Sequence, residues 1–279
     1  LKATDYRIVE RTAVVTLNRP TRGNAWTGRL HAEYVHCIGR AEADPEVRVI
    51  VITGAGSAFC VGGDTDALAG HVDRGGYDDG LGRAGDAGVH DGDGSGGSLG
   101  AGVHPEFETH MTFHFGLTKP VIAAINGPAA GIGLALACFA DLRFARPGAK
   151  LTTAHGKLNL PAEYGLSWLL PRHIGLTRAM DLLLTSRVFL TDEAAELGLI
   201  NQLHPADELL DRTIEYAADL ASTVSAGSLQ ATRQQVYLDL HRGVGVSVDE
   251  SRDRLDTMMG QPDYAKGVAA LREKRPPNF

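Results

Sequence analysis

Residues 121–145 read VIAAINGPAAGIGLALACFADLRFA, and this stretch decides the fold class. Its two ends, Val121–Ile125 and Leu142–Ala145, are short apolar runs of the kind that form strands buried in a layered core. Between them, small residues lead from the first strand into an apolar segment that predicts a helix. A strand, a glycine turn, a helix and a further strand together indicate an α/β protein.

The rest of the chain extends this pattern in both directions. Ala13–Leu17 and Val47–Thr53 are apolar and β-branched, and both are expected to be strands. Thr27–Ala43 predicts a helix, Thr191 is expected to cap another, and from Asp192 onward the pattern is almost entirely helical. This order favours a sheet-containing core followed by a helical C-terminal region. Periodicity alone equally allows one mixed fold without a separable subdomain.

The composition excludes several classes of protein. Of 279 residues, 43% are apolar and 22% are charged, which suits a folded protein with a large core. The formal charge of −7 provides no basic face, so no nucleic acid partner is expected. No apolar run reaches the roughly 18 residues of a membrane span, so no membrane partner is expected. Three separated cysteines predict neither a disulfide framework nor a metal site, and favour a reducing, cytoplasmic location.

Glycine and aspartate dominate one segment, at about residues 70–102. Such a composition buries too little apolar surface to offset the entropy of ordering the chain. We therefore expect a long mobile loop inserted into the domain. It is either a tolerated surface insertion or a lid over a substrate.

Two glycine turns are the features of the sequence that indicate a type of chemistry. One, residues 54–64, follows the strand Val47–Thr53, and the other, residues 126–137, follows Val121–Ile125. Two turns of this kind suggest a pair of backbone amides that converge on one oxygen, as in an oxyanion hole. The dinucleotide fingerprint is not matched, because Phe59 and Leu136 occupy the positions that require a third small residue.

The chain resembles the enoyl-CoA hydratase/isomerase, or crotonase, superfamily along almost its whole length. The motifs that carry the resemblance are Arg19-Pro20 followed by Gly23-Asn24-Ala25, and residues 58–64, 119–127, 140–145 and 267–275. The resemblance implies a ClpP-like spiral of repeated ββα units over residues 1–200 and a helical trimerisation region over residues 201–279. It also implies an acyl-CoA substrate, with coenzyme A as part of that substrate and no separate cofactor, and a homotrimer or a dimer of trimers.

The resemblance assigns binding roles to particular positions. The oxyanion hole would consist of the backbone N–H groups of Gly63 and Ile132. Contacts to the substrate or its coenzyme A moiety would come from Ala25, Val61, Gly62, Asp64, Gly131 and Lys274. For Asp64 a structural role is favoured, in which hydrogen bonds to local amides orient the turn. Lys274 would reach a coenzyme A phosphate from a neighbouring subunit, or is simply a solvated charge in a basic tail.

The catalytic acids depart from the family pattern. Hydratases of this family use two glutamates, and Ala135 and His155 stand at the corresponding positions. Because alanine transfers no proton, the two-glutamate hydration is not expected. Glu163 falls where some isomerases and dehalogenases of the superfamily place an acid, and its apolar sequence neighbours predict a raised pKa. Both residues also allow a purely structural interpretation. Glu163 would then cap a helix or form a surface ion pair, and His155 would be a buried structural histidine.

The favoured chemistry is therefore double-bond isomerisation by a single carboxylate, Glu163. Water addition by Glu163 together with His155 is the closest alternative. A hydrolase with His155 as its base and a non-catalytic acyl-CoA binder also remain open. Four further histidines, without companion carboxylates, are interpreted as surface or packing residues and not as metal ligands: His31, His36, His110 and His114.

Overall fold

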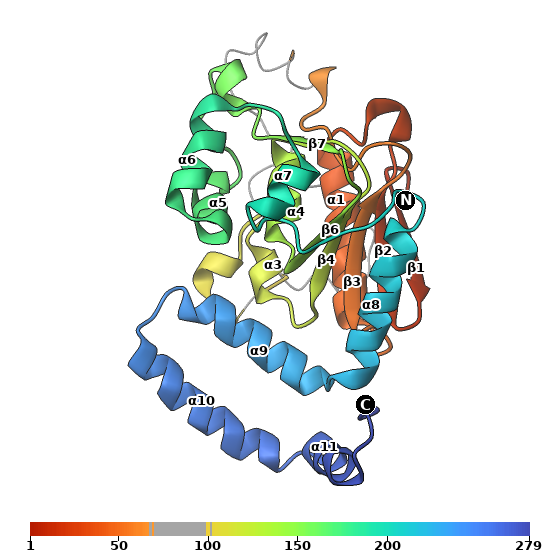
Figure 1. Cartoon of the computed structure of the whole chain (residues 1–279), viewed down its shortest axis with the longest axis vertical. Coiled ribbons are helices and arrows are strands. Elements are labelled where there is room, and N and C mark those ends of the chain that lie inside the picture. Colours follow the sequence, from red (N-terminus) through yellow and green to blue (C-terminus); the bar gives the residue numbers. More distant parts are fainter. Residues whose placement is uncertain (67–68, 70–98, 101) are drawn as a thin grey trace.

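A computed structural model describes residues 1–66, 69, 99–100 and 102–279 of the chain (Figure 1). The glycine-rich insertion predicted at about residues 70–102 lies almost entirely outside the described residues.

A six-stranded sheet forms the centre of the molecule, in the order β1-β2-β3-β4-β6-β9 (Figure 1). Only β1 and β2 pair in antiparallel fashion, and the remaining pairs are parallel. The strands are β1 (Thr4–Val9), β2 (Thr12–Leu17), β3 (Val49–Gly54), β4 (Val121–Ile125), β6 (Leu142–Ala145) and β9 (Gln202–Leu203). The four strands predicted from apolar runs are thus confirmed. The edge strand β1 was not predicted, because only its first residue, Thr4, is buried and the apolar signal is weak.

A second, three-stranded sheet gives the chain its spiral course. It consists of β5 (Ala129–Ala130), β7 (Lys150–Thr152) and β8 (Phe189–Leu190), in the order β5-β7-β8. A strand in the large sheet is followed by a strand in the small one, and then by a helix, as in β4, β5 and α4 (Ile132–Phe139). This alternation confirms the α/β class and places the second glycine turn where the chain passes from the large sheet to the small one.

Helices make up the remaining regular structure, and most of them follow β7. They are α1 (Gly28–Ala43), α3 (Phe113–Gly116), α5 (Leu166–Ile174), α6 (Leu176–Thr185), α7 (Thr191–Glu196), α8 (Leu209–Thr223), α9 (Ala226–Asp239), α10 (Val244–Met259) and α11 (Pro262–Glu273), with 3-10 turns η1 (Pro20–Arg22), η2 (Pro105–Phe107) and η3 (His155–Leu158). None of the helices in the described part of the chain combines the length and apolarity needed to cross a membrane. The division of the chain at residue 200 stays a prediction.

The helix predicted over Thr27–Ala43 is confirmed, whereas the cap predicted for another helix is wrong. The Thr27 hydroxyl accepts a hydrogen bond from the Leu30 amide at 3.2 Å, which fixes the start of α1. Thr191, however, is the first residue of α7 and not its cap. Its hydroxyl instead donates to the Arg146 carbonyl at 2.7 Å, because the end of β8 brings this side chain beside that loop.

The two faces of the large sheet are buried against different helices. Side chains at alternate positions of β2, β3 and β4 point to opposite faces, as pleating requires. One face packs on α1 and α4, and the other packs on α8, which crosses the sheet in Figure 1. Burial on both faces explains why these strands are apolar without alternation.

A buried cluster of polar groups attaches α9 to the core. The guanidinium of Arg233 donates from Nε to Asp141 at 2.8 Å and from Nη1 to the Leu117 carbonyl at 2.5 Å. The hydroxyl of Tyr237, one turn further along α9, donates to the other oxygen of Asp141 at 2.5 Å. Arg233 is 6% exposed, so the bonds satisfy a charge that water no longer solvates.

Replacing Arg233 with alanine is expected to lower the free energy of unfolding by about 3 kcal/mol, because the partly buried Asp141 would lose its charged partner and the buried Leu117 carbonyl its donor. Denaturant unfolding followed by circular dichroism measures this loss. The matched control is Arg212→Ala, since Arg212 pairs with Glu208 and Glu215 on the exposed face of α8. An equal loss for both variants would contradict the assigned importance of the buried cluster.

Candidate active site

The two glycine turns lie side by side, although about seventy residues separate them in sequence. Cys60 and Ala129 form a parallel β-bridge, and the Ala130 amide donates to the Cys60 carbonyl at 3.0 Å. A Cβ on Gly133 would lie 2.0 Å from that carbonyl oxygen, so only glycine permits this approach. The contact holds Gly62 and Gly131 in neighbouring loops.

Gly63 presents its N–H on the open side of the first turn. Trp26 donates to the Gly62 carbonyl at 2.8 Å and accepts from the Asp64 amide at 3.0 Å. In a parallel bridge these two bonds flank the intervening residue, whose own N–H then faces away from Trp26. Within the described residues, the Gly63 amide donates to no acceptor.

Ile132 presents a second such N–H at the start of α4. Gly131 precedes it with φ 50° and ψ −120°, a conformation suited to glycine, and donates its own amide to Thr152 at 3.1 Å. Ile132 is the first residue of the helix, where amides have no partner within the helix. In the part of the chain that the structure describes, its N–H has no acceptor either.

Glu163 lies against the second turn. One of its carboxylate oxygens, Oε2, is 3.6 Å from the position that a Cβ on Gly131 would occupy. Positive φ angles at Tyr164 (48°) and Gly165 (79°) form the sharp bend that places Glu163 there before α5 begins. Burial raises the pKa of Glu163, and the nearby charge of His155 acts in the opposite sense without cancelling this rise.

His155 is the second polar group near Glu163. It begins η3, is 6% exposed, and its Nδ1 is a buried atom without a hydrogen-bond partner among the described residues. Ala135, by contrast, is fully buried in α4 and contributes no ionisable group. The structure thus brings Glu163 to the second turn and His155 near Glu163, with no carboxylate at position 135.

Glu163 is predicted to be a catalytic base, and because a base must be ionised to accept a proton, its raised pKa gives a kinetic prediction. We expect kcat/KM to be constant above this pKa and to fall about tenfold per pH unit below it. The midpoint is expected above the value of about 4.3 that is typical of a solvated glutamate. A pH profile of kcat/KM measures it. A profile that stays flat down to the typical value would contradict the role of a buried Glu163.

Asp64 lies in an ion-pair cluster at the end of the first turn. Its oxygens accept from Arg19 at 2.9 Å, from Arg22 at 3.1 Å and from the Asp66 amide at 3.1 Å. Burial acts to raise the pKa of Asp64, but these hydrogen bonds outweigh it and the pKa lies below its usual value. One local amide donates to Asp64, while the two arginine partners were not predicted, and the role of Asp64 stays a prediction.

The remaining predicted contact residues divide into two groups. Ala25 and Val61 lie with the first turn, where the Val61 amide donates to Gly23 at 3.1 Å and the Ala25 carbonyl accepts from Arg19 at 2.5 Å. Lys274 follows α11, which lies well below α4 in Figure 1. The chain does not bring Lys274 to its own glycine turns, so a role across a subunit boundary stays a prediction.

The histidines outside the turns fall at surface or packing positions. His36 and His110 are exposed, whereas His31 and His114 are buried. His114 lies 2.6 Å from the Tyr34 hydroxyl and 2.5 Å from the Met111 carbonyl. Burial lowers the pKa of His114 to about 4, so this ring is neutral at physiological pH.

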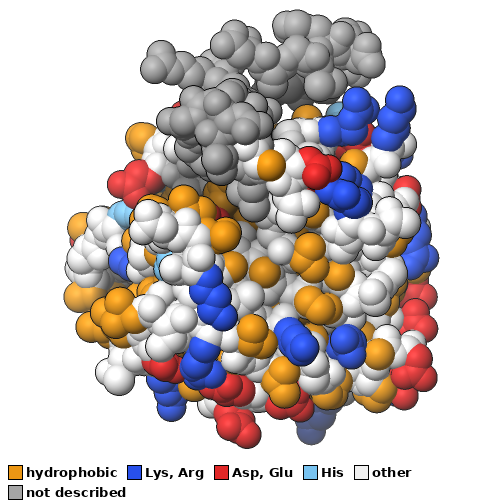
Figure 2. All heavy atoms as spheres, turned by 90° about the horizontal axis from the view of Figure 1, so that it is seen from above, with side chains coloured by type: hydrophobic (Ala, Val, Ile, Leu, Met, Phe, Trp, Pro, Cys, Tyr) orange, Lys and Arg blue, Asp and Glu red, His pale blue; other side chains and the backbone are white. Residues whose placement is uncertain are grey.

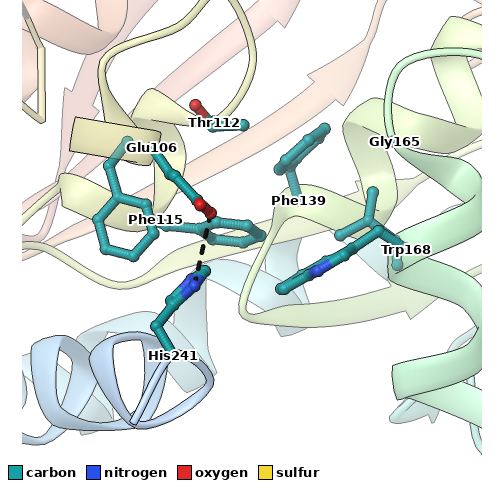
Figure 3. Close-up of a pocket in the computed structure, with 9 residues that line it drawn as sticks. Glu106, Thr112, Phe115, Phe139, Gly165, Trp168 and His241 are labelled. Atoms are coloured by element: carbon teal, nitrogen blue, oxygen red, sulfur yellow. Dashed lines mark ion pairs between the residues drawn. The ribbon is translucent and has the colours of Figure 1, made fainter. Parts of the chain in front are cut away.

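A pocket of about 140 Å³ lies beside Gly165, beyond Glu163 along the chain, and the sequence did not predict it (Figure 3). Its walls are mainly aromatic and come from η2, α3, α4, α5 and the segment after α9. Gly165, two residues after Glu163, forms part of the wall. No local sequence pattern predicts the pocket, because its lining residues lie in segments that are far apart in the chain.

Comparison with known families and proteins gives consistent matches over nearly the whole chain. A sequence model of the enoyl-CoA hydratase/isomerase family matches residues 7–81 and 88–279. The 1,2-epoxyphenylacetyl-CoA isomerase of Escherichia coli K12 is 33% identical, with 95% of this chain and 93% of that protein covered. A probable enoyl-CoA hydratase of Rhodobacter capsulatus is also 33% identical, with 98% and 96% covered.

Solved structures of similar fold carry names from the same family. The crystal structure of a probable enoyl-CoA hydratase/isomerase from Mycobacterium abscessus matches with a TM-score of 0.82 at 29% identity, covering 100% of this chain and 99% of the other. A putative enoyl-CoA hydratase/isomerase family protein from Hyphomonas neptunium matches with a TM-score of 0.81 at 28% identity, with 99% and 97% covered.

Proposed function

This chain belongs to the enoyl-CoA hydratase/isomerase family, and from that premise we propose that it isomerises the double bond of an enoyl-CoA with Glu163 as its single base. The predicted crotonase fold is confirmed, as is the expectation that the protein is an enzyme of the lyase or isomerase type. The specific reaction and the roles of individual residues are the proposal.

The observation that carries the proposal is the place of the Glu163 carboxylate, beside Gly131 and therefore next to the Ile132 amide. A thioester oxygen held by the Gly63 and Ile132 amides would put the C2 proton of a 3-enoyl-CoA near this carboxylate. Glu163 takes that proton, the negative charge moves onto the thioester oxygen, and the proton returns to C4. The double bond ends in conjugation, with no atom gained or lost.

The alternative, water addition, is favoured by one specific observation. His155 lies close enough to Glu163 for its charge to lower that pKa, and its Nδ1 has no partner among the described residues. A histidine so placed could hold or activate a water that a second glutamate holds in other hydratases. The relative from Rhodobacter capsulatus is named a probable hydratase, whereas the one from Escherichia coli is named an isomerase.

Oxygen-18 water separates the two reactions. The protein is incubated with a trans-3-enoyl-CoA in labelled water, and the product mass and the double-bond position are measured together. Isomerisation predicts an unchanged mass with the double bond moved into conjugation. A trans-2-enoyl-CoA is incubated in parallel, and its gain of labelled water while the trans-3-enoyl-CoA stays unchanged would overturn the proposal in favour of hydration.

We also propose that the protein assembles as a trimer or a dimer of trimers through its C-terminal helices. In α10 the side chains of Val244, Val248 and Leu255 are 82%, 53% and 53% exposed, an unusual density of apolar surface for one helix. Three apolar residues of α6, at the left of Figure 1, are likewise exposed, namely Leu176, Met180 and Leu184. Orange side chains also gather at the left of Figure 2.

Val248→Asp combined with Leu255→Asp is expected to reduce the mass in solution from that of three or six copies to a smaller species. A charge placed in an apolar interface costs several kcal/mol, because it loses its hydration. Light scattering coupled to gel filtration measures the mass. Asp256→Asn, on the same helix, is the control and should leave it unchanged. A wild-type monomer at micromolar concentration would contradict the assembly.

A further inference from the structure

Aromatic rings from four separate segments surround the pocket beyond Glu163 (Figure 3). Phe115 in α3 is at the centre of the group, with ring centroids 5.2 Å from Phe139, 5.7 Å from Trp168 and 5.8 Å from Phe107. These are the separations of edge-on and tilted aromatic pairs. The ring of His241 stacks on Trp168 at 6.4 Å and completes the wall.

The pocket lies close to the proposed reaction site along the chain, because one of its lining residues follows Glu163 closely. Gly165 lines the pocket and follows Glu163 by two residues, which span at most about 7 Å. A Cβ on Gly165 would lie 3.8 Å from Phe139 Cζ and 4.0 Å from Leu169 Cδ1, so the bend after Glu163 touches the aromatic wall directly. A substrate held at Glu163 therefore needs only a short linker to reach the pocket.

The size of the pocket selects among acyl groups. Its volume of about 140 Å³ is close to that of an engineered apolar cavity of about 150 Å³ that binds benzene. An extended alkyl chain, in contrast, needs a long channel to stay out of water. Here a polar pair lines the solvent-exposed side of the pocket, where His241 Nδ1 lies 3.4 Å from Oε2 of Glu106, whose side chain is 68% exposed (Figure 3). A chain that continued past the rings would meet these polar groups.

We infer that the enzyme prefers acyl-CoA thioesters that end in one aromatic ring on a short linker, and that Phe115, Phe139 and Trp168 hold this ring. The inference rests on the proposed function, since the thioester must be held at Gly63 and Ile132 for the ring to reach the pocket. A ring packed against two aromatic walls gains a further factor of about ten in affinity over an aliphatic group of equal carbon number.

Binding of unreactive thioesters tests the preference directly. Phenyl-terminated saturated acyl-CoAs with linkers of increasing length are compared, by calorimetry, with straight-chain acyl-CoAs of equal carbon number. In the wild type we expect one linker length to bind about tenfold more tightly than its straight-chain match. Trp168→Leu and Phe115→Leu are expected to remove most of this ratio, and Thr112→Phe, which fills the pocket, should abolish it.

Tyr216→Leu is the matched control, because Tyr216 is a partly exposed aromatic residue of α8 outside the pocket, and it should keep the ratio. Turnover of but-3-enoyl-CoA by the wild type is measured in parallel, since this small substrate does not need the pocket. Turnover without any aromatic preference would overturn this inference and spare the proposed function. Aromatic preference without turnover of any enoyl-CoA would support the pocket and overturn the proposed isomerisation.

Discussion

Glu163→Gln is expected to lower kcat for double-bond isomerisation about a thousandfold, because glutamine has nearly the same shape but accepts no proton. Positioned acids and bases contribute about 10²–10⁴ to enzyme rates. The affinity for acyl-CoA is expected to stay within a few-fold, since the proposed thioester contacts come from the Gly63 and Ile132 amides. Single-turnover kinetics on a 3-enoyl-CoA and calorimetry with a saturated acyl-CoA measure the two quantities separately.

Two further variants make this result specific. Glu163→Asp keeps the carboxylate but moves it away from the substrate by the length of one methylene group. We therefore expect an intermediate loss of kcat, and we expect kcat/KM still to fall at low pH. Glu208→Gln changes an exposed glutamate that pairs with Arg212 and should not alter kcat. If Glu163→Gln kept the wild-type rate, another group would have to be the base, and His155 would become the first candidate.

Ile132→Pro is expected to lower kcat about 10²–10³-fold, because it removes one of the two proposed oxyanion donors. Proline is well suited to this position, since Ile132 is the first residue of α4 and its N–H bonds to nothing within the helix. Gly131 before it has ψ −120°, outside the helical region that a following proline disfavours. The substitution therefore removes this donor with little disturbance of the backbone, and its Cδ also enters the space that the N–H faced.

The side chain is controlled by a second variant, Ile132→Val, which loses one methylene group but keeps the N–H. It is expected to retain kcat and to lose only about 1 kcal/mol of stability. Circular dichroism and thermal unfolding of both variants show whether α4 is intact. A folded Ile132→Pro variant with the kcat of the wild type would show that this amide does not stabilise the transition state.

The parts of the fold that could be predicted from the sequence are those with a local signal. β4 and β6 are short apolar runs because both faces of the large sheet are covered, and α1 carries its own cap at Thr27. β1 lacks such a signal, as an edge strand with one buried residue. At Thr191 the local signal wrongly predicts a helix cap, because its hydroxyl donates to the carbonyl of Arg146, in a loop distant in sequence.

The candidate site was predictable only in part. The glycine turns can be recognised in the sequence, because close contacts such as that of Gly133 with the Cys60 carbonyl leave no room for a side chain and so require glycine. Glu163 could be selected by its resemblance to family positions, but its nearness to Gly131 depends on the bend at Tyr164 and Gly165. The arginine partners of Asp64 and the aromatic pocket could not be predicted, since tertiary packing alone brings their residues together.

The central claim is that one carboxylate carries a proton from C2 to C4, and a deuterium label tests it most directly. A 3-enoyl-CoA deuterated at C2 is converted in ordinary water, and deuterium at C4 of the product is measured by mass spectrometry and NMR from the first turnovers onward. Because Glu163 is partly shielded from water, we predict detectable deuterium at C4 together with a primary isotope effect on kcat. A product with no deuterium at C4, even in the first turnovers, would contradict the account.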